Sequence, residues 1–123
     1  MNRQRGDGRR TCLFAIVAMV ALSGVACGGS GGGCTSDEAT ALSGPLRMQN
    51  RGFSPDCFKV ASGSTISVDN KDAMPHTFTV EGSNIDLLLT RGQAGSASAP
   101  AVGTYDFICK IHEGMRGTIV VTE

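Results

Sequence analysis

Apolar and polar residues alternate in short runs along the second half of the chain, and turn residues separate the runs. The clearest runs cover residues 57–60, 65–70, 76–80, 103–109 and 117–123, and weaker ones cover 85–90 and 92–100. An alternation of period two places every second side chain on the same face of a strand. Helical periodicity is almost absent, so the pattern predicts an all-β domain, an antiparallel sandwich or barrel of short strands.

The first 44 residues do not share this alternation. Residues 1–10 contain four arginines and one aspartate, and the apolar run that follows them is too short to span a bilayer. This order is typical of a secretory signal peptide, which we expect to cover residues 1–26. Residues 27–44 are rich in glycine and polar residues, which predicts a flexible tether. Residues 45–123 are then expected to form a single folded domain.

The sequence around Cys27 bears on where the protein resides. Small residues, Gly24 and Ala26, precede Cys27, and this arrangement resembles the cleavage site of bacterial lipoproteins, in which the cysteine carries the lipid. Ordinary cleavage after Ala26 is the alternative. Both alternatives imply export to the periplasm or to the outer face of a bacterial membrane, and lipidation would add an anchor.

Cysteine usage agrees with export. Cys12 lies in the expected signal peptide and Cys27 is the candidate lipidation site, so Cys34, Cys57 and Cys109 remain. An odd number of cysteines in an oxidising compartment suggests one disulfide and one thiol kept for another purpose. Our hypothesis is a disulfide between Cys34 and Cys57, with Cys109 held apart as a metal ligand.

Charge narrows the range of partners. From residue 35 onward the chain has seven basic and ten acidic side chains, a net charge of −3, and no basic run. This composition argues against nucleic-acid binding.

One histidine begins a predicted strand and a cysteine ends another, so both positions lie where a strand leaves the core. These residues are His76 and Cys109, and His112 and Met115 follow the cysteine at three-residue intervals. A thiolate, two imidazoles and a thioether are the donors of a trigonal copper site with a weak axial methionine, which is used for electron transfer. A buried free cysteine beside unrelated loop residues is the alternative. The use of both histidines of the chain favours a metal site.

The motifs MPHTF and GTYDFICKIHEGMRG resemble those of the cupredoxins, the small blue copper proteins of the plastocyanin and amicyanin type, and the likeness extends over residues 46–123. The resemblance implies a Greek-key β-sandwich that binds one copper ion. By this match His76, Cys109 and His112 would be equatorial ligands and Met115 the axial ligand. The protein would be a monomeric one-electron carrier between a donor and an acceptor redox protein, and not an enzyme.

The resemblance also implies contacts around the ligands. The N–H of Thr77 would bond to the sulfur of Cys109, and the Thr77 hydroxyl would donate a hydrogen bond that ties the two ligand loops together. Plastocyanin and amicyanin carry a proline where this chain has Ile111, so a second N–H is available to the sulfur. The edge of the His112 ring would reach the surface and pass the electron.

Three other functions use similar residues. A periplasmic copper carrier without an electron-transfer role would exchange its metal readily. Copper enzymes built from cupredoxin domains need further ligands from a second domain or subunit, and this chain has no spare histidine. A structural zinc site could use cysteine and histidine, but methionine is a poor zinc ligand.

Overall fold

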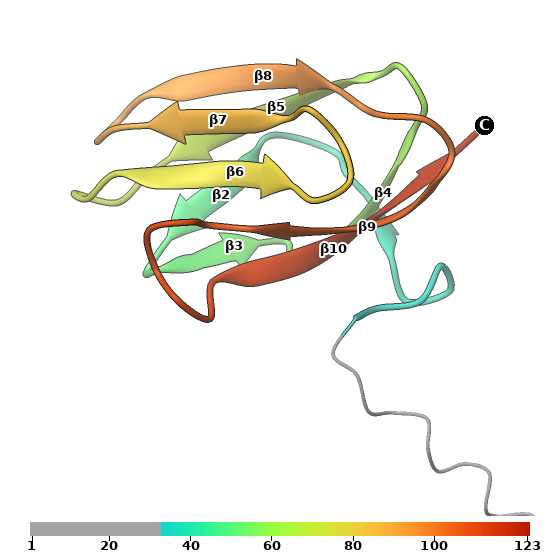
Figure 1. Cartoon of the computed structure of the whole chain (residues 1–123), viewed down its shortest axis with the longest axis horizontal. Coiled ribbons are helices and arrows are strands. Elements are labelled where there is room, and N and C mark those ends of the chain that lie inside the picture. The colour runs from blue at the N-terminus through green and yellow to red at the C-terminus, as the bar shows by residue number, and fades with distance from the viewer. Residues whose placement is uncertain (1–32) are drawn as a thin grey trace, which may run out of the picture. The chain divides into compact units, whose positions relative to one another are not determined.

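The computed structural model describes residues 33–123, which contain ten strands and no helix (Figure 1). The strands are β1 (Thr40–Ala41), β2 (Leu46–Gln49), β3 (Gly52–Ser54), β4 (Cys57–Ala61), β5 (Thr65–Asn70), β6 (His76–Val80), β7 (Asp86–Leu89), β8 (Ala94–Ser98), β9 (Gly103–Ile108) and β10 (Arg116–Thr122). Over this part of the chain there is no helix long and apolar enough to cross a membrane. The expected signal peptide and Cys27 lie outside the described residues.

The strands form two sheets. One has the order β1-β4-β10-β9-β6-β7 and the other the order β3-β2-β5-β8. Three hairpins each connect two strands of the same sheet: β2 to β3, β6 to β7 and β9 to β10. Every other connection crosses to the opposite sheet (Figure 1). The predicted all-β sandwich is therefore confirmed. The expected antiparallel arrangement holds for five of the eight strand pairs; β4 pairs with β1 and with β10 in parallel, and β2 pairs with β5 in parallel.

All seven runs of alternating residues form strands, and their inward positions supply most of the core, to which β2 and β3 add Leu46, Met48 and Phe53. Phe107 of β9 lies at its centre, with the ring centroids of Phe53, Phe58 and Phe78 at 4.8, 5.5 and 5.3 Å. A Cβ atom at Gly117 of β10 would lie 2.5 Å from the carbonyl oxygen of Asp56 and would also meet the Phe107 ring. Glycine at that position lets β10 pack closely against the end of β9.

The folded part of the chain begins before residue 45. A disulfide joins Cys34 to Cys57, as the cysteine count suggested. Thr40 and Ala41 pair with β4, and Ala39 is buried. The boundary expected at residue 44 is therefore too late, because a disulfide and a two-residue strand hold residues 34–44 on the sandwich without any alternating pattern.

Four connections lie at one end of the sandwich, on the left in Figure 1. Backbone hydrogen bonds tie two of them to neighbouring strand ends: Lys71 donates to Met48 of β2, Gly92 donates to Asn70 of β5, and Asn70 donates to Gln93. The fourth, between β9 and β10, carries His112 beside the start of β6. We call this end the site end and define it as residues 50–51, 71–75, 90–93 and 109–116.

Candidate metal centre

Three of the four predicted ligands bring their donor atoms together at the site end. The Sγ atom of Cys109 lies 3.7 Å from Nδ1 of His76 and 3.8 Å from Nδ1 of His112. The two Nδ1 atoms are 3.0 Å apart. His76 is fully buried at the start of β6, Cys109 is 5% exposed just after β9, and the His112 ring is partly exposed.

The triangle made by these atoms has the size of a metal site. The centre of the circle through the three donors lies about 2.0 Å from each, close to the distances of roughly 2.0–2.3 Å at which divalent metals sit from imidazole and thiolate. One thiol and two imidazoles form the donor set that copper takes in blue-copper sites. The donors therefore match copper in both chemistry and spacing.

Met115 completes the set. Its side chain is 3% exposed and lines the same small hollow as Cys109 and His112. The Met115 carbonyl accepts a hydrogen bond from the Cys109 N–H at 2.9 Å, and the Met115 N–H donates to the His112 carbonyl at 3.3 Å. Gly114 has φ +85°, a conformation that glycine adopts without strain. The loop is thus closed on itself, and it returns the methionine to the cysteine.

A carboxylate that the sequence analysis did not identify orients His76. Oδ2 of Asp72 lies 2.7 Å from Nε2 of His76. An Nε2–H that donates to this carboxylate leaves the Nδ1 lone pair directed at the other two donors. Asp72 therefore selects the tautomer that a metal ligand needs.

The Asp72 carboxylate is itself held by the β2–β3 turn. The backbone N–H groups of Asn50 and Arg51 donate to its two oxygens at 2.8 and 3.0 Å. The bond from Arg51 is the main cause that lowers the pKa of the Asp72 carboxyl, burial opposes it, and Asn50 and His76 lower it further. Asn70, buried behind the loop, accepts a bond from the Asp72 N–H and donates to the Met74 carbonyl. In the sequence, the feature that could have indicated this contact is an acidic residue four positions before His76.

The sulfur of Cys109 lies in surroundings that favour the thiolate. Burial raises the pKa of its thiol, but the N–H groups of Thr77 and Ile111 and the rings of His112 and His76 together lower it from 9.0 to about 6. The N–H of Thr77 lies 3.3 Å from the sulfur. The thiolate is the form that binds metals, so the folded chain presents its sulfur ready to bind near neutral pH.

Thr77 also joins the two ligand-bearing strands. Its hydroxyl oxygen accepts a hydrogen bond from the Lys110 N–H at 2.8 Å, so it acts as the acceptor rather than as the donor expected from the sequence. Thr77 is buried although it lies on the face opposite His76 in the alternation. The threonine side chain is therefore long enough to tie the loops.

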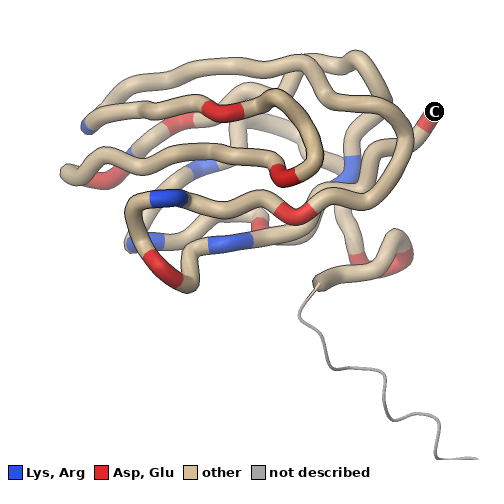
Figure 2. The backbone as a smooth tube through the Cα atoms, viewed as in Figure 1, with Lys and Arg blue, Asp and Glu red and all other residues tan. Residues whose placement is uncertain are grey.

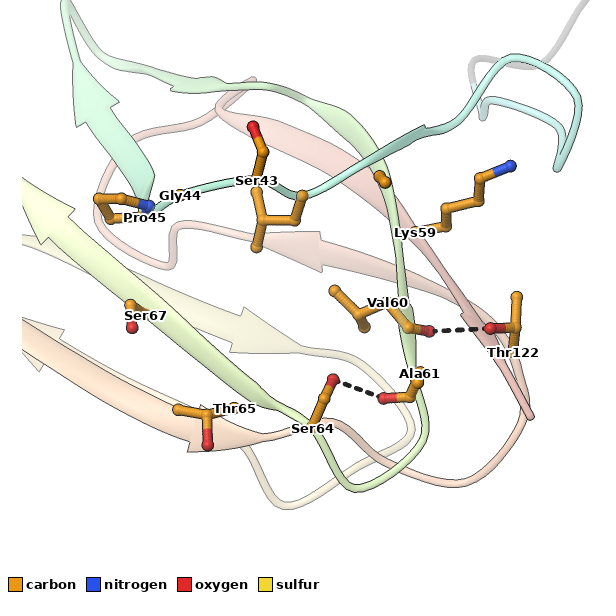
Figure 3. Close-up of a pocket in the computed structure, with 12 residues that line it drawn as sticks. Ser43, Gly44, Pro45, Lys59, Val60, Ala61, Ser64, Thr65, Ser67 and Thr122 are labelled. Carbon is orange, nitrogen blue, oxygen red and sulfur yellow. Dashed lines mark hydrogen bonds between the residues drawn. The ribbon is translucent and has the colours of Figure 1, made fainter.

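A larger hollow, of about 620 Å³, lies away from these residues (Figure 3). It is lined by the crossing segment 41–45, by β4 and β5, and by Thr122. The Ser64 hydroxyl donates to the Ala61 carbonyl at 2.6 Å, and Thr122 donates to the Val60 carbonyl at 3.5 Å (Figure 3). The hollow contains no histidine, cysteine or carboxylate, so we assign no chemistry to it.

Comparison with known proteins agrees with this geometry. The cupredoxin-like domain family matches residues 13–121. Amicyanin-alpha of Methylorubrum extorquens (strain AM1) is 30% identical over 118 residues, which cover 91% of this chain and 98% of the relative. Plastocyanin of Scenedesmus fuscus is 30% identical over 83 residues, which cover 56% of this chain and 85% of the relative.

A solved structure agrees as well. A Cu(I) form of an amicyanin variant superimposes with a TM-score of 0.56 and 27% identity, covering 76% of this chain and 94% of the amicyanin chain. Cupredoxin homologues bind one copper ion, and the cluster of His76, Cys109, His112 and Met115 could hold it. The family match and the relative's near-complete coverage together establish that the chain belongs to the cupredoxin-like family.

Proposed function

We propose that this protein binds one copper ion through His76, Cys109, His112 and Met115 and acts as a one-electron carrier, not an enzyme, between redox partners in the cell envelope. The observation that carries the proposal is the triangle of two Nδ1 atoms and one Sγ atom, with sides of 3.0, 3.7 and 3.8 Å. Bound copper would supply the change between the Cu(I) and Cu(II) states.

The chain's own contribution is a ligand set that is held in place. Asp72 fixes the His76 ring, the Thr77 N–H bonds to the Cys109 sulfur, and the loop to Met115 is closed by backbone hydrogen bonds. Ligands restrained in this way move little when an electron arrives, and small rearrangement favours fast transfer. The exit route is the His112 ring, the partly exposed member of the triangle.

The proposed location follows from the cysteines. The disulfide between Cys34 and Cys57 supports folding in an oxidising compartment. The basic and apolar leader supports export, and the small residues before Cys27 support lipidation there. We therefore place the domain outside the cytoplasm, close to a membrane.

Repeated redox cycling tests the carrier function. The copper-loaded protein should be reduced by ascorbate and reoxidised by hexacyanoferrate(III) over many cycles, with one electron per copper and no loss of metal to a chelator such as EDTA. Loss of copper within a few cycles would contradict the electron-carrier function and favour a copper carrier. A zinc site would show no redox cycle at all.

A further inference from the structure

Basic residues that are scattered along the sequence are gathered by the fold at the site end. The site end carries five basic and two acidic side chains, a net charge of +3; these are Arg51, Lys71, Arg91, Lys110 and Arg116 against Asp72 and Glu113. The rest of residues 33–123 carries two basic and eight acidic side chains, a net charge of −6. Figure 2 shows most blue positions toward the end that holds the β9–β10 loop, whereas red positions occur at both ends.

Local pairing leaves the arginines as the main uncompensated charges of the site end. Lys71 pairs with Asp69 at 3.3 Å, and Lys110 pairs with Asp86 at 2.6 Å. Within residues 33–123, by contrast, no carboxylate lies at ion-pair distance from Arg51, Arg91 or Arg116. All three arginines are exposed. We call these three residues the arginine rim.

Apolar side chains lie among these charges. Ile111, which precedes His112, is 46% exposed. Leu88 of β7 is 61% exposed and is paired with Thr77, next to the start of β6. An apolar centre with charged residues around it is the usual anatomy of a protein interface, and arginine is enriched there because its guanidinium group binds carboxylates with two parallel hydrogen bonds.

We propose that the site end docks onto an acidic protein surface, with carboxylates of the partner facing the arginine rim and apolar groups facing Ile111 beside the His112 edge. The identity of this partner as a redox protein rests on the proposed function. Opposite charge raises the rate of productive encounter. The negative charge of the rest of the domain turns the site end toward such a partner before contact.

The first test does not depend on copper chemistry. Hexacyanochromate(III) is a paramagnetic trivalent anion that exchanges no electrons here, and it broadens the amide NMR signals of residues near its binding site. In the whole chain at low ionic strength, broadening among the signals of residues 33–123 should be confined to the site end. It should disappear near 1 M salt, where the screening length is about 3 Å. Broadening spread evenly over the domain would overturn the inference.

Matched charge reversals sharpen this test. Arg91→Glu and Arg116→Glu should each reduce the broadening several-fold. Lys59→Glu makes the same change of charge on β4, where Figure 3 draws the lysine side chain extending from the strand, and it should leave the broadening unchanged. Arg51 is unsuitable for this substitution because its N–H holds Asp72. Equal effects of all three variants would overturn the inference.

The second test measures electron exchange by the copper-loaded chain. Its oxidation by hexacyanoferrate(III) should slow with added salt, and Arg91→Glu should slow it by about tenfold at low salt. Oxidation by the cation tris(phenanthroline)cobalt(III) should show the opposite salt dependence. No exchange with either complex would contradict the proposed function alone. Exchange that is insensitive to the rim charge would overturn the docking surface alone.

Anionic lipid is the competing source of negative charge. Vesicles of phosphatidylglycerol and phosphatidylcholine should sediment no more of the unlipidated chain than of its Arg91→Glu variant. Binding to these vesicles that Arg91→Glu abolishes would assign the arginine rim to a membrane surface and overturn the proposal of a protein partner.

Discussion

The backbone N–H of Lys110 donates to the hydroxyl of Thr77 over 2.8 Å, and this bond links the two strands that carry the first two ligands. The contact continues outward: the Thr77 and Thr79 hydroxyls lie 3.0 Å apart, and Thr79 donates to Asp86 at 2.8 Å. Asp86 in turn pairs with the amino group of Lys110. The hydrogen bonds form a closed circuit over β6, β7 and the end of β9, and Thr77 is its buried member.

Replacing Thr77 with valine tests this link. Valine keeps the shape of threonine but leaves the Lys110 N–H without its acceptor. We expect unfolding in urea to show a loss of about 1–3 kcal/mol and the Lys110 amide to exchange faster with solvent. Thr77→Ser keeps a hydroxyl and should preserve the slow exchange. Equal exchange rates in the two variants would show that the hydroxyl does not hold the loop.

Asp72→Asn tests the orientation of His76. The amide is a weaker acceptor than the carboxylate and carries no charge. Copper affinity, measured by competition with a chelator, should fall by about 10–100-fold. The reduction potential should rise, because a lost negative charge favours Cu(I). Asp69→Asn removes a neighbouring charge that contacts Lys71 and not His76, and it should change neither quantity by a comparable amount.

Ile111→Pro removes one of the two backbone N–H groups that act on the Cys109 sulfur. Without this N–H beside the sulfur the thiolate donates more electron density to Cu(II), so the reduction potential should fall. Cyclic voltammetry measures the change. The side chain at position 111 is partly exposed, so Ile111→Ala serves as a control that keeps the N–H. A potential that is unchanged or higher in the proline variant alone would refute this role.

The lowered pKa of Cys109 predicts a pH-dependent stability of the metal-free protein. Its pKa is about 6 in the folded chain against an ordinary value of 9.0, so between these values the unfolded chain binds more protons. Stability should therefore rise with pH over this range, by at most about 1.4 kcal/mol per pH unit, and it should be lost as the pH falls through 6. Urea titrations of the parent and of Cys109→Ser should differ in this slope. Parallel slopes would contradict the thiolate assignment.

The sequence was informative where apolar and polar residues alternate clearly between turn residues. The strands that carry His76 and lead to Cys109 were predicted because apolar residues at every second position also form the core. β2 and β3 were missed because each is short, and because the turn between them uses Asn50 and Arg51 at φ 56° and 58° in place of glycine. The backbone N–H groups of these two residues hold the Asp72 carboxylate.

The four donor residues were recognisable from their types and spacing, but the contacts that hold them in place were not. The contact from Asp72 to His76 depends on a loop that folds back, and no local pattern encodes it. Charge shows the same limit, since the basic residues of the arginine rim are 25 or more positions apart in the chain and only the sandwich gathers them. Residues 34–44 were misassigned because a disulfide, not hydrophobic periodicity, attaches them.

The visible absorption spectrum of the Cu(II)-loaded protein tests the central claim most directly. If Cys109, His76, His112 and Met115 hold copper together, the protein should be intensely blue from a thiolate-to-copper charge-transfer band. Cys109→Ser should abolish that band, while Lys59→Glu should leave it intact. A colourless or weakly coloured Cu(II) complex would show that the four donors do not assemble around copper, and it would contradict the account.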